Sequence, residues 1–343
     1  MGAKVSIRNF QTVIEVPDGD FILDVALDGG LDYPHGCRSG NCGACKSVLH
    51  RGEVELAEYS DFALTEEERG AGQILACRAQ PRGDCEISFM EPDERADHPR
   101  RFLDCRVVEL ARATHDITIV RLGVEAGGPY QFSAGQYASV TFPGQPPRDY
   151  SMANHPDDQV LEFHVRLTPG GTVSAFVANR LKPGDMVSVE GPFGVSYLRD
   201  KHTGPIVACA GGSGLAPIKS IVDTALAKGM RQPIKLYFGT RDERDVYLEA
   251  HFKALAARHP NLEFQTVLSE PSGATPRRTG LMMNVLKQDF RDLDGAKAYL
   301  AGPPIMVETC VAELEKLGVR REDCHADAFY TAAEMAAKAG QPA

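Results

Sequence analysis

Residues 36–45 read GCRSGNCGAC and hold three of the nine cysteines of the chain together with three glycines. Glycine adopts positive φ values without strain and has no Cβ, so a loop rich in glycine can fold closely around a bound group. Such a loop can also turn its backbone N–H groups toward sulfur atoms. The stretch therefore predicts a loop that wraps a small group held by cysteine thiolates.

The spacing of four cysteines defines the predicted group. Cys37, Cys42 and Cys45 are separated by four and then two residues, and Cys77 follows within ILACRA. This C-x4-C-x2-C…C arrangement is the plant-type ferredoxin spacing, in which four thiolates hold a 2Fe-2S cluster. The sequence thus predicts Cys37, Cys42, Cys45 and Cys77 as the metal ligands of such a cluster.

Two other metal sites fit the pattern less well. A structural zinc site favours paired C-x2-C spacings on both sides, whereas this chain has a triplet and a distant fourth cysteine. A Rieske centre needs two histidines on one iron, and His35 alone lies beside the loop. The remaining cysteines have no ligand spacing and are interpreted as small buried hydrophobic residues: Cys85, Cys105, Cys209, Cys310 and Cys324.

Composition limits the class of protein. The 343 residues are 43% hydrophobic and 24% charged, which suffices for two or three domains. The net charge of -10 argues against binding to nucleic acid and suits a protein partner with a basic face. No stretch reaches the ~20 consecutive apolar residues of a membrane span, and the opening MGAKVSIRNF lacks the apolar core of a signal peptide. We expect a cytoplasmic monomer without membrane contact.

The hydrophobic pattern divides the chain into three predicted domains and a linker. Residues 1–90 combine strand-like and helical runs, as in a compact α+β unit. Residues 91–100, EPDERADHPR, are polar and predict a linker. Residues 101–198 contain short alternating runs separated by Gly and Pro, typical of an antiparallel barrel or sandwich. Residues 199–343 alternate buried strand-like runs with helical segments, which predicts a parallel sheet flanked by helices.

Local signals mark two helices inside these domains. FILDVAL, at residues 21–27, is an apolar run of helical type. LTEEE offers a helix start with Thr65 as the N-cap and Glu68 three residues later as its capping-box partner.

Three further motifs can bind a flavin or a dinucleotide. RDYSMAN, at residues 148–154, offers an arginine for a pyrophosphate, an aromatic ring for stacking and a hydroxyl group. HVRLTPGGTVS, at residues 164–174, offers backbone and hydroxyl donors. ACAGGSGLAP, at residues 208–217, joins a buried strand to a helix, which places amide donors and the positive helix end beside a diphosphate. It departs from the dinucleotide fingerprint, because Pro217 stands where the third glycine belongs.

Together these segments resemble a known family. The cysteine spacing resembles that of plant-type ferredoxins, and the other three motifs resemble those of the ferredoxin–NADP reductase superfamily. Their order is similar to that of the NADH-dependent reductase components of bacterial aromatic-ring oxygenases. The resemblance implies a β-grasp-like 2Fe-2S ferredoxin domain, an antiparallel β-barrel that binds FAD, and a parallel-sheet α/β domain that binds NADH.

The resemblance also implies roles for individual residues. FAD would be bound by residues of the first two motifs: Arg148, Tyr150, Ser151, His164, Val165, Arg166, Gly170, Gly171 and Ser174. The nicotinamide dinucleotide would be bound by the glycine loop and the ends of two later strands: Gly211, Gly212, Gly214, Thr240, Arg241, Gly302, Pro303 and Met306. Ser151, near flavin N5, and Phe329, over the flavin face, are the implied catalytic residues, with Asp327 as a polar contact in the same pocket. The alternative is that Phe329 is a terminal aromatic residue that only closes the core.

Two features bear on the nucleotide. Many relatives have a cysteine before the Gly-Pro pair, where this chain has Ala301, so a contribution of that cysteine to hydride transfer has no counterpart here. Asp242 and Asp245 disfavour a ribose 2′-phosphate by like charge, so NADH is expected rather than NADPH, although Arg241 could serve a phosphate.

The implied function is electron transfer. NADH would pass a hydride to FAD, and single electrons would reach the cluster and then the terminal oxygenase of a Rieske-type aromatic-ring dioxygenase. The same electron chain could instead serve a soluble di-iron monooxygenase or a deoxysugar dehydrase. A non-catalytic redox sensor, which uses cluster and nucleotide as ligands, is the alternative from another class.

Overall fold

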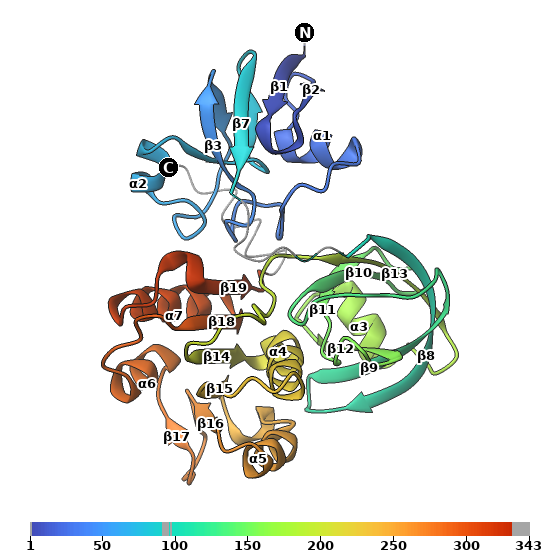
Figure 1. The fold of residues 1–343 in the computed structure, drawn as a ribbon. Coiled ribbons are helices and arrows are strands. Elements are labelled where there is room, and N and C mark those ends of the chain that lie inside the picture. Colours follow the sequence, from blue (N-terminus) through green and yellow to red (C-terminus); the bar gives the residue numbers. More distant parts are fainter. Residues whose placement is uncertain (1, 91–95, 97, 331–343) are drawn as a thin grey trace. The chain divides into compact units, whose positions relative to one another are not determined.

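The computed structural model describes residues 2–90, 96 and 98–330, and it divides into two compact units (Figure 1). The first contains residues 2–90, and the second runs from Ala96 to Phe329. The predicted linker, residues 91–100, lies mostly outside the described residues, which omit 91–95 and 97. Within the described ranges, no helix is both long and apolar enough to cross a membrane.

The first unit is built on a five-stranded mixed sheet in the order β2-β1-β7-β3-β5. β1 and β7 are parallel, and the other neighbours are antiparallel. The strands are β1 (Ala3–Ile7), β2 (Thr12–Val16), β3 (Lys46–Arg51), β5 (Gln73–Leu75) and β7 (Cys85–Phe89). The unit also has a strand pair and two helices, β4 (Val54–Leu56), β6 (Ala79–Pro81), α1 (Ile22–Asp28) and α2 (Glu66–Gly70). This arrangement is the expected β-grasp-like ferredoxin fold.

Both helices of this unit form in the segments where the sequence predicts them. α1 buries Ile22, Leu23 and Ala26 in the core of the unit, as the apolar FILDVAL run requires. At the start of α2, the N–H of Glu68 donates to the Thr65 hydroxyl at 3.2 Å, and the N–H of Thr65 donates to the Glu68 carboxylate at 2.9 Å. This reciprocal capping box confirms the predicted helix start.

The second unit begins with a six-stranded antiparallel sheet in the order β11-β10-β13-β8-β9-β12. Its strands are β8 (Arg101–Arg112), β9 (Ile117–Ala126), β10 (Tyr137–Thr141), β11 (Arg148–Ser151), β12 (Val160–Arg166) and β13 (Met186–Phe193). A bridge between Met152 and Phe163 joins the two outer strands of this order, so the sheet curls into a barrel. Helix α3 (Thr172–Asn179) packs against β9 and β12. The antiparallel barrel predicted for this region is therefore confirmed.

A six-stranded parallel sheet, β17-β16-β15-β14-β18-β19, completes the second unit. Its strands are β14 (Ile206–Gly211), β15 (Ile234–Thr240), β16 (Leu262–Leu268), β17 (Arg278–Thr279), β18 (Lys297–Gly302) and β19 (Cys324–Ala328). Helices α4 (Leu215–Ala227) and α5 (Glu249–Arg258) cover one side of the sheet, and α6 (Met282–Asp289) and α7 (Pro304–Lys316) cover the other (Figure 1). This is the expected parallel-sheet α/β domain.

Strand β14 lies at the point where the strand order reverses. β15, which follows it in the chain, lies on one side, and β18 lies on the other. In open α/β sheets a ligand crevice forms at the carboxyl end of such a strand. The short 3-10 helix η2 (Gly212–Gly214) begins at this end of β14 and leads into α4.

Candidate functional site: cluster loop and flavin–nicotinamide crevice

Two neighbouring strands bring the predicted cluster ligands together. Cys45 directly precedes β3, and Cys77 follows β5, which is the antiparallel neighbour of β3. Thiol contacts join Cys45 to Cys77 and Cys37 to Cys42, and the charge of Cys42 acts on Cys45. All four cysteines singled out by their spacing therefore meet at one place.

The pKa shifts of these thiols fit a site that binds a cluster of metal ions. A hydrogen bond from Cys42 lowers the pKa of Cys37 to about 5, whereas the same contact, together with burial, raises the pKa of Cys42. Contact with Cys77, followed by burial, raises the pKa of Cys45. Several buried thiols can all become thiolates only when a metal compensates their charge. Four converging cysteines are the donor set that holds a 2Fe-2S cluster.

The glycines of the loop allow the backbone to approach the sulfur atoms. The N–H of Cys37 donates to Sγ of Cys42, and the N–H of Asn41 donates to Sγ of Cys37, each at 3.3 Å. Gly40 and Gly43 adopt φ values of 77° and 74°, which side chains with a Cβ rarely allow. Gly36 does not have positive φ, but a Cβ there would lie 3.0 Å from Sγ of Cys42. Its role is therefore close approach rather than backbone conformation.

His35, just before the loop, and Arg38, within it, are not among the predicted ligands. Nδ1 of His35 lies 2.8 Å from the carbonyl oxygen of Tyr33, in agreement with its interpretation as a residue outside the ligand set. Arg38 adopts a φ of 55°, although it is not glycine, and its guanidinium donates to Asp24 at 2.7 Å. Sequence reasoning did not single out Arg38, because its side chain gives no sign of the backbone conformation it must adopt.

The RDYSMAN motif lies on β11, at the edge of the barrel. Ser151 is buried, and its hydroxyl donates to Oδ2 of Asp327 at 3.2 Å. Burial raises the pKa of Tyr150 to about 12, so its phenol stays neutral. Arg148 is exposed, and its Nη1 donates to the carbonyl oxygen of Pro147. The structure thus joins Ser151 of the barrel to Asp327 of the parallel-sheet domain, two residues predicted for the flavin pocket.

The HVRLTPGGTVS motif forms the end of β12 and the start of α3. Val165 contributes its side chain to the barrel core. The hydroxyl of Ser174 lies 3.1 Å from the hydroxyl of Thr168 and accepts the N–H of Thr168 at 3.2 Å. Gly170 has a φ of 73°, and Gly171 is the N-cap residue of α3, where a Cβ would overlap the side chains around it. The two glycines therefore allow a tight turn that leads directly into the first backbone N–H groups of α3.

Two side chains of β12 extend toward the parallel-sheet domain rather than along the barrel. His164 is fully buried, and its Nδ1 lies 3.0 Å from the hydroxyl oxygen of Tyr247. Nε of Arg166 donates to Oδ2 of Asp116 at 2.8 Å, and a Cβ built on Gly212 would lie 3.2 Å from Nη1 of Arg166. Both side chains therefore stand at the junction with the glycine loop.

The glycine loop and the end of β18 approach one another at backbone distance. A Cβ built on Gly211 would lie 2.7 Å from both Sδ of Met306 and Cδ of Pro303. A Cβ on Gly302, whose φ is 142°, would lie 2.7 Å from the carbonyl oxygen of Gly211, and Gly214 has no room for a Cβ against the backbone of β18. The structure thus brings together residues predicted for the nicotinamide dinucleotide from two distant segments.

The end of β15 presents a carboxylate at the crevice. Thr240 is buried, and its hydroxyl lies 3.4 Å from the carbonyl oxygen of Asp242. Arg241 is exposed. Hydrogen bonds from Ser272, followed by one from the N–H of Glu243, lower the pKa of Asp242. The carboxylate next to Thr240 and Arg241 therefore remains negative at neutral pH.

The last described strand, β19, lies at the edge of the parallel sheet beyond β18. β19 runs parallel to β18, and the N–H of Phe329 donates to the carbonyl oxygen of Gly302 at 2.9 Å. Phe329 is half-buried and packs in part against the core of the parallel-sheet domain. Its position is compatible both with a ring over the flavin and with an aromatic residue that closes the core.

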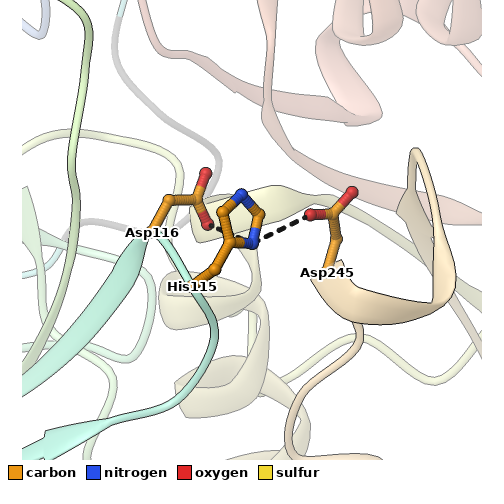
Figure 2. A group of neighbouring side chains, drawn as sticks. All are labelled: His115, Asp116 and Asp245. Carbon is orange, nitrogen blue, oxygen red and sulfur yellow. Dashed lines mark ion pairs between the residues drawn. The ribbon is translucent and has the colours of Figure 1, made fainter.

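Sequence reasoning missed the residues that join the barrel to the parallel-sheet domain. Figure 2 shows His115 between the carboxylates of Asp116 and Asp245, with Nδ1 at 3.9 Å and 3.5 Å from them. The sequence marks Asp245 only through its charge and gives no signal for Tyr247. Lys219 donates to the carbonyl oxygen of Ala153 at 2.9 Å. No local pattern marks these residues, because their partners come from another domain.

Three family models match the chain in the order of the three domains. They are described as the 2Fe-2S iron-sulfur cluster binding domain, which matches residues 6–82, the oxidoreductase FAD-binding domain, which matches residues 104–197, and the oxidoreductase NAD-binding domain, which matches residues 209–312. The fold and its sites thus define an iron–sulfur flavoprotein oxidoreductase, with a 2Fe-2S cluster, FAD and NAD as its cofactors.

Known relatives narrow this class. The chain is 40% identical to the ferredoxin–NAD(P)+ reductase component of the naphthalene 1,2-dioxygenase system of Pseudomonas putida, over 95% of this chain and 98% of that protein. It is 41% identical to the corresponding component of the naphthalene 1,2-dioxygenase/salicylate 5-hydroxylase systems of Ralstonia sp., over 91% and 94%. The crystal structure of an Amycolatopsis cytochrome P450 reductase is 34% identical with a TM-score of 0.77, over 95% and 98%. The chain belongs to the family of reductase components of multicomponent oxygenase systems.

Proposed function

We propose that this protein carries electrons from NADH through FAD to its 2Fe-2S cluster, and from there to the terminal oxygenase of a Rieske-type aromatic-ring dioxygenase. The observation that carries the proposal is the junction inside the second unit. Ser151 on the barrel meets Asp327 beside β18, at the same edge where Gly302 approaches Gly211. A flavin motif and a nicotinamide motif therefore border one crevice.

Each residue at this junction has a proposed part. Bound FAD would accept a hydride from nicotinamide and release electrons singly to the cluster. Ser151 presents a hydroxyl, oriented by Asp327, to the site of hydride transfer. Tyr150 offers a neutral ring for stacking, and Phe329 covers the opposite face. The remaining contacts to FAD, including those to its pyrophosphate, are proposed for Arg148, His164, Val165, Arg166, Gly170, Gly171 and Ser174. The contacts to NADH are proposed for Gly211, Gly212, Gly214, Thr240, Arg241, Gly302, Pro303 and Met306.

NADH is the proposed donor rather than NADPH. The lowered pKa of Asp242 keeps a negative charge where a ribose 2′-phosphate would bind, and like charges repel. We also propose domains at residues 1–90, 101–198 and 199–343, with a linker at 91–100. The protein would be a cytoplasmic monomer. Its acidic surface would bind a basic face of the oxygenase partner.

An anaerobic titration with NADH tests the electron chain. Iron, sulfide and flavin are quantified in the same sample that is followed by visible absorbance and low-temperature EPR. We expect the flavin to bleach and a rhombic signal of a reduced 2Fe-2S cluster to appear. A flavin that bleaches without this signal, in a sample with full iron content, would contradict transfer to the cluster. Failure to reduce cytochrome c or ferricyanide with NADH would favour the redox sensor.

Reconstitution identifies the acceptor. The reductase is mixed with a Rieske-type oxygenase and its aromatic substrate, and in parallel with a di-iron hydroxylase or a deoxysugar dehydrase. NADH-dependent product formation is expected with the Rieske-type oxygenase. Product formed with one of the other two acceptors alone would contradict the proposed partner and leave the electron chain intact.

A further inference from the structure

A buried hydrogen-bonded chain crosses from the barrel to the parallel-sheet domain. Oε1 of Glu162 lies 3.2 Å from Nε2 of His164, whose Nδ1 lies 3.0 Å from the hydroxyl oxygen of Tyr247. The Tyr247 hydroxyl also donates to the carbonyl oxygen of Gly212 at 3.3 Å. His164 and Tyr247 are both buried. One hydroxyl group therefore stands between the flavin strand β12 and the glycine loop.

The protons in this chain have defined positions. Burial raises the pKa of Tyr247, so the phenol keeps its single proton. Burial lowers the pKa of His164, so its ring is neutral at neutral pH. Because the Glu162 carboxylate only accepts hydrogen bonds, the His164 proton lies on Nε2, and Nδ1 is an acceptor. The Tyr247 proton is therefore shared by two acceptors, Nδ1 of His164 and the carbonyl oxygen of Gly212.

The segment that carries Tyr247 approaches the barrel at a second point. The short 3-10 helix η3 (Glu243–Asp245) precedes Tyr247, and Oδ1 of Asp245 lies 3.5 Å from Nδ1 of His115 on the turn between β8 and β9 (Figure 2). This segment continues from the end of β15. It thus lies close to the barrel at Asp245 and is hydrogen-bonded to it at Tyr247.

Helix α4 contacts the barrel through hydrogen bonds of a different kind. Lys219 donates to the carbonyl oxygen of Ala153, and Ser220 donates to that of Asn154 at 2.7 Å. These bonds hold the helix that follows the glycine loop. The Tyr247 hydroxyl reaches the loop itself, at Gly212, whose φ is 54°. Tyr247 is therefore the side chain through which β12 can set the position of Gly212.

We propose that Tyr247 is a positioning residue for hydride transfer, because its hydroxyl fixes the glycine loop of the nicotinamide site against the flavin strand. The inference rests on the proposed transfer from NADH to FAD. Tyr247 is buried behind the loop, so it acts on the alignment of the dinucleotide more than on its affinity. Small errors of alignment between reacting groups have large effects on rate.

Two matched substitutions test the proposal in the holoenzyme. Tyr247→Phe removes the shared hydroxyl. Tyr237→Phe removes the same group from another buried tyrosine of the parallel-sheet domain, on β15, whose hydroxyl donates to Asp289 at 2.8 Å. Stopped-flow reduction of the flavin by NADH gives the limiting rate and the NADH dissociation constant separately. The long-wavelength charge-transfer absorbance reports how closely nicotinamide stacks on flavin.

We expect Tyr247→Phe to lower the limiting rate about tenfold, the factor that corresponds to one hydrogen bond, with a weaker charge-transfer band. The NADH dissociation constant should change less than twofold, and Tyr237→Phe should match the unmodified protein in all three readouts. Equal rates in both variants, or a loss of NADH affinity without a loss of limiting rate, would overturn the proposal. An unmodified protein whose flavin is not reduced by NADH would instead contradict the proposed function.

A second substitution tests the same link from the barrel side. His164→Phe keeps an aromatic ring against Tyr247, and Glu162 retains Arg121, at 2.8 Å, as a cationic partner. If the two residues act through one hydrogen bond, adding Tyr247→Phe to His164→Phe should lower the limiting rate less than twofold further. A full additional tenfold loss would show that Tyr247 does not act through His164.

Discussion

The cluster loop and the flavin–nicotinamide crevice hold their cofactors in opposite ways. Three of the four predicted cluster ligands lie within ten residues, and backbone N–H groups of the same loop donate to sulfur atoms of Cys37 and Cys42. The crevice is assembled from β11, β12, the glycine loop and the ends of β15, β18 and β19. The first site depends on side-chain identity at fixed spacing. The second depends on how closely backbones from distant segments approach.

The largest expected effect is the loss of the cluster from its loop, without an effect on the flavin–nicotinamide crevice. Cys42→Ser removes a predicted cluster ligand, so we expect loss of the cluster, with iron falling to near zero, while NADH still reduces the flavin. Cys85→Ser, in the same unit but outside the ligand spacing, is the control and should keep full iron. Iron and sulfide analysis with EPR measures both. A full iron complement in Cys42→Ser would contradict the ligand assignment.

The second effect breaks the long-range site. Gly214→Ala places a Cβ against the carbonyl oxygen of Ala301, so the glycine loop must move away from β18. We expect flavin reduction by NADH to fall at least about tenfold while the cluster content is unchanged. Gly273→Ala, where a Cβ meets nothing within 4 Å, is the matched control. Stopped-flow reduction compares the two, and equal rates would contradict the close approach.

The third effect is the pH dependence of the stability of the second unit. Burial would raise the pKa of Glu162, but His164, Lys219 and Arg121 together lower it to about 2. A carboxylate with a lowered pKa stabilises the fold above its unfolded pKa of about 4.3, and that contribution is lost as pH falls toward 2. His164 is held neutral by burial, so protonation of the unfolded chain below about pH 6.5 also favours unfolding.

We therefore expect the temperature of flavin release to fall as the pH decreases from 7 to 4, and more steeply below 4.3. Glu162→Gln should flatten the lower part of this profile. Glu109→Gln is the control, because Glu109 pairs with the same Arg121 but is half exposed, where such pairs contribute little. Flavin fluorescence measures the release. Identical profiles for Glu162→Gln and the unmodified protein would contradict the role of Glu162.

The smallest expected effect is on the stability of the first unit. Thr65→Ala removes the N-cap of α2, which we expect to cost about 1 kcal/mol of unfolding free energy. Glu67→Ala changes an exposed residue of the same helix outside the capping box and should leave stability nearly unchanged. Denaturant unfolding followed by cluster absorbance measures both. A destabilisation by Glu67→Ala as large as that by Thr65→Ala would contradict the cap.

The sequence predicted features whose cause is local and missed those whose cause is not. Cysteine spacing and the Thr65 capping box are local, and both predicted what the structure shows. The alternation of β12 indicates that His164 and Arg166 share a face, but it cannot tell which domain that face meets. Tyr247 has no neighbouring pattern at all, because its partners come from β12 and the glycine loop.

The contact of Gly214 with the end of β18 has a consequence for how the chain folds. The two segments are separated by most of the parallel-sheet domain in sequence, and long-range closure slows the formation of a contact. The β8–β9 pair, by contrast, joins strands connected by a short turn. We therefore expect the barrel to consolidate before the nucleotide crevice. A chain at that stage would already capture flavin but would not yet recognise a nicotinamide nucleotide.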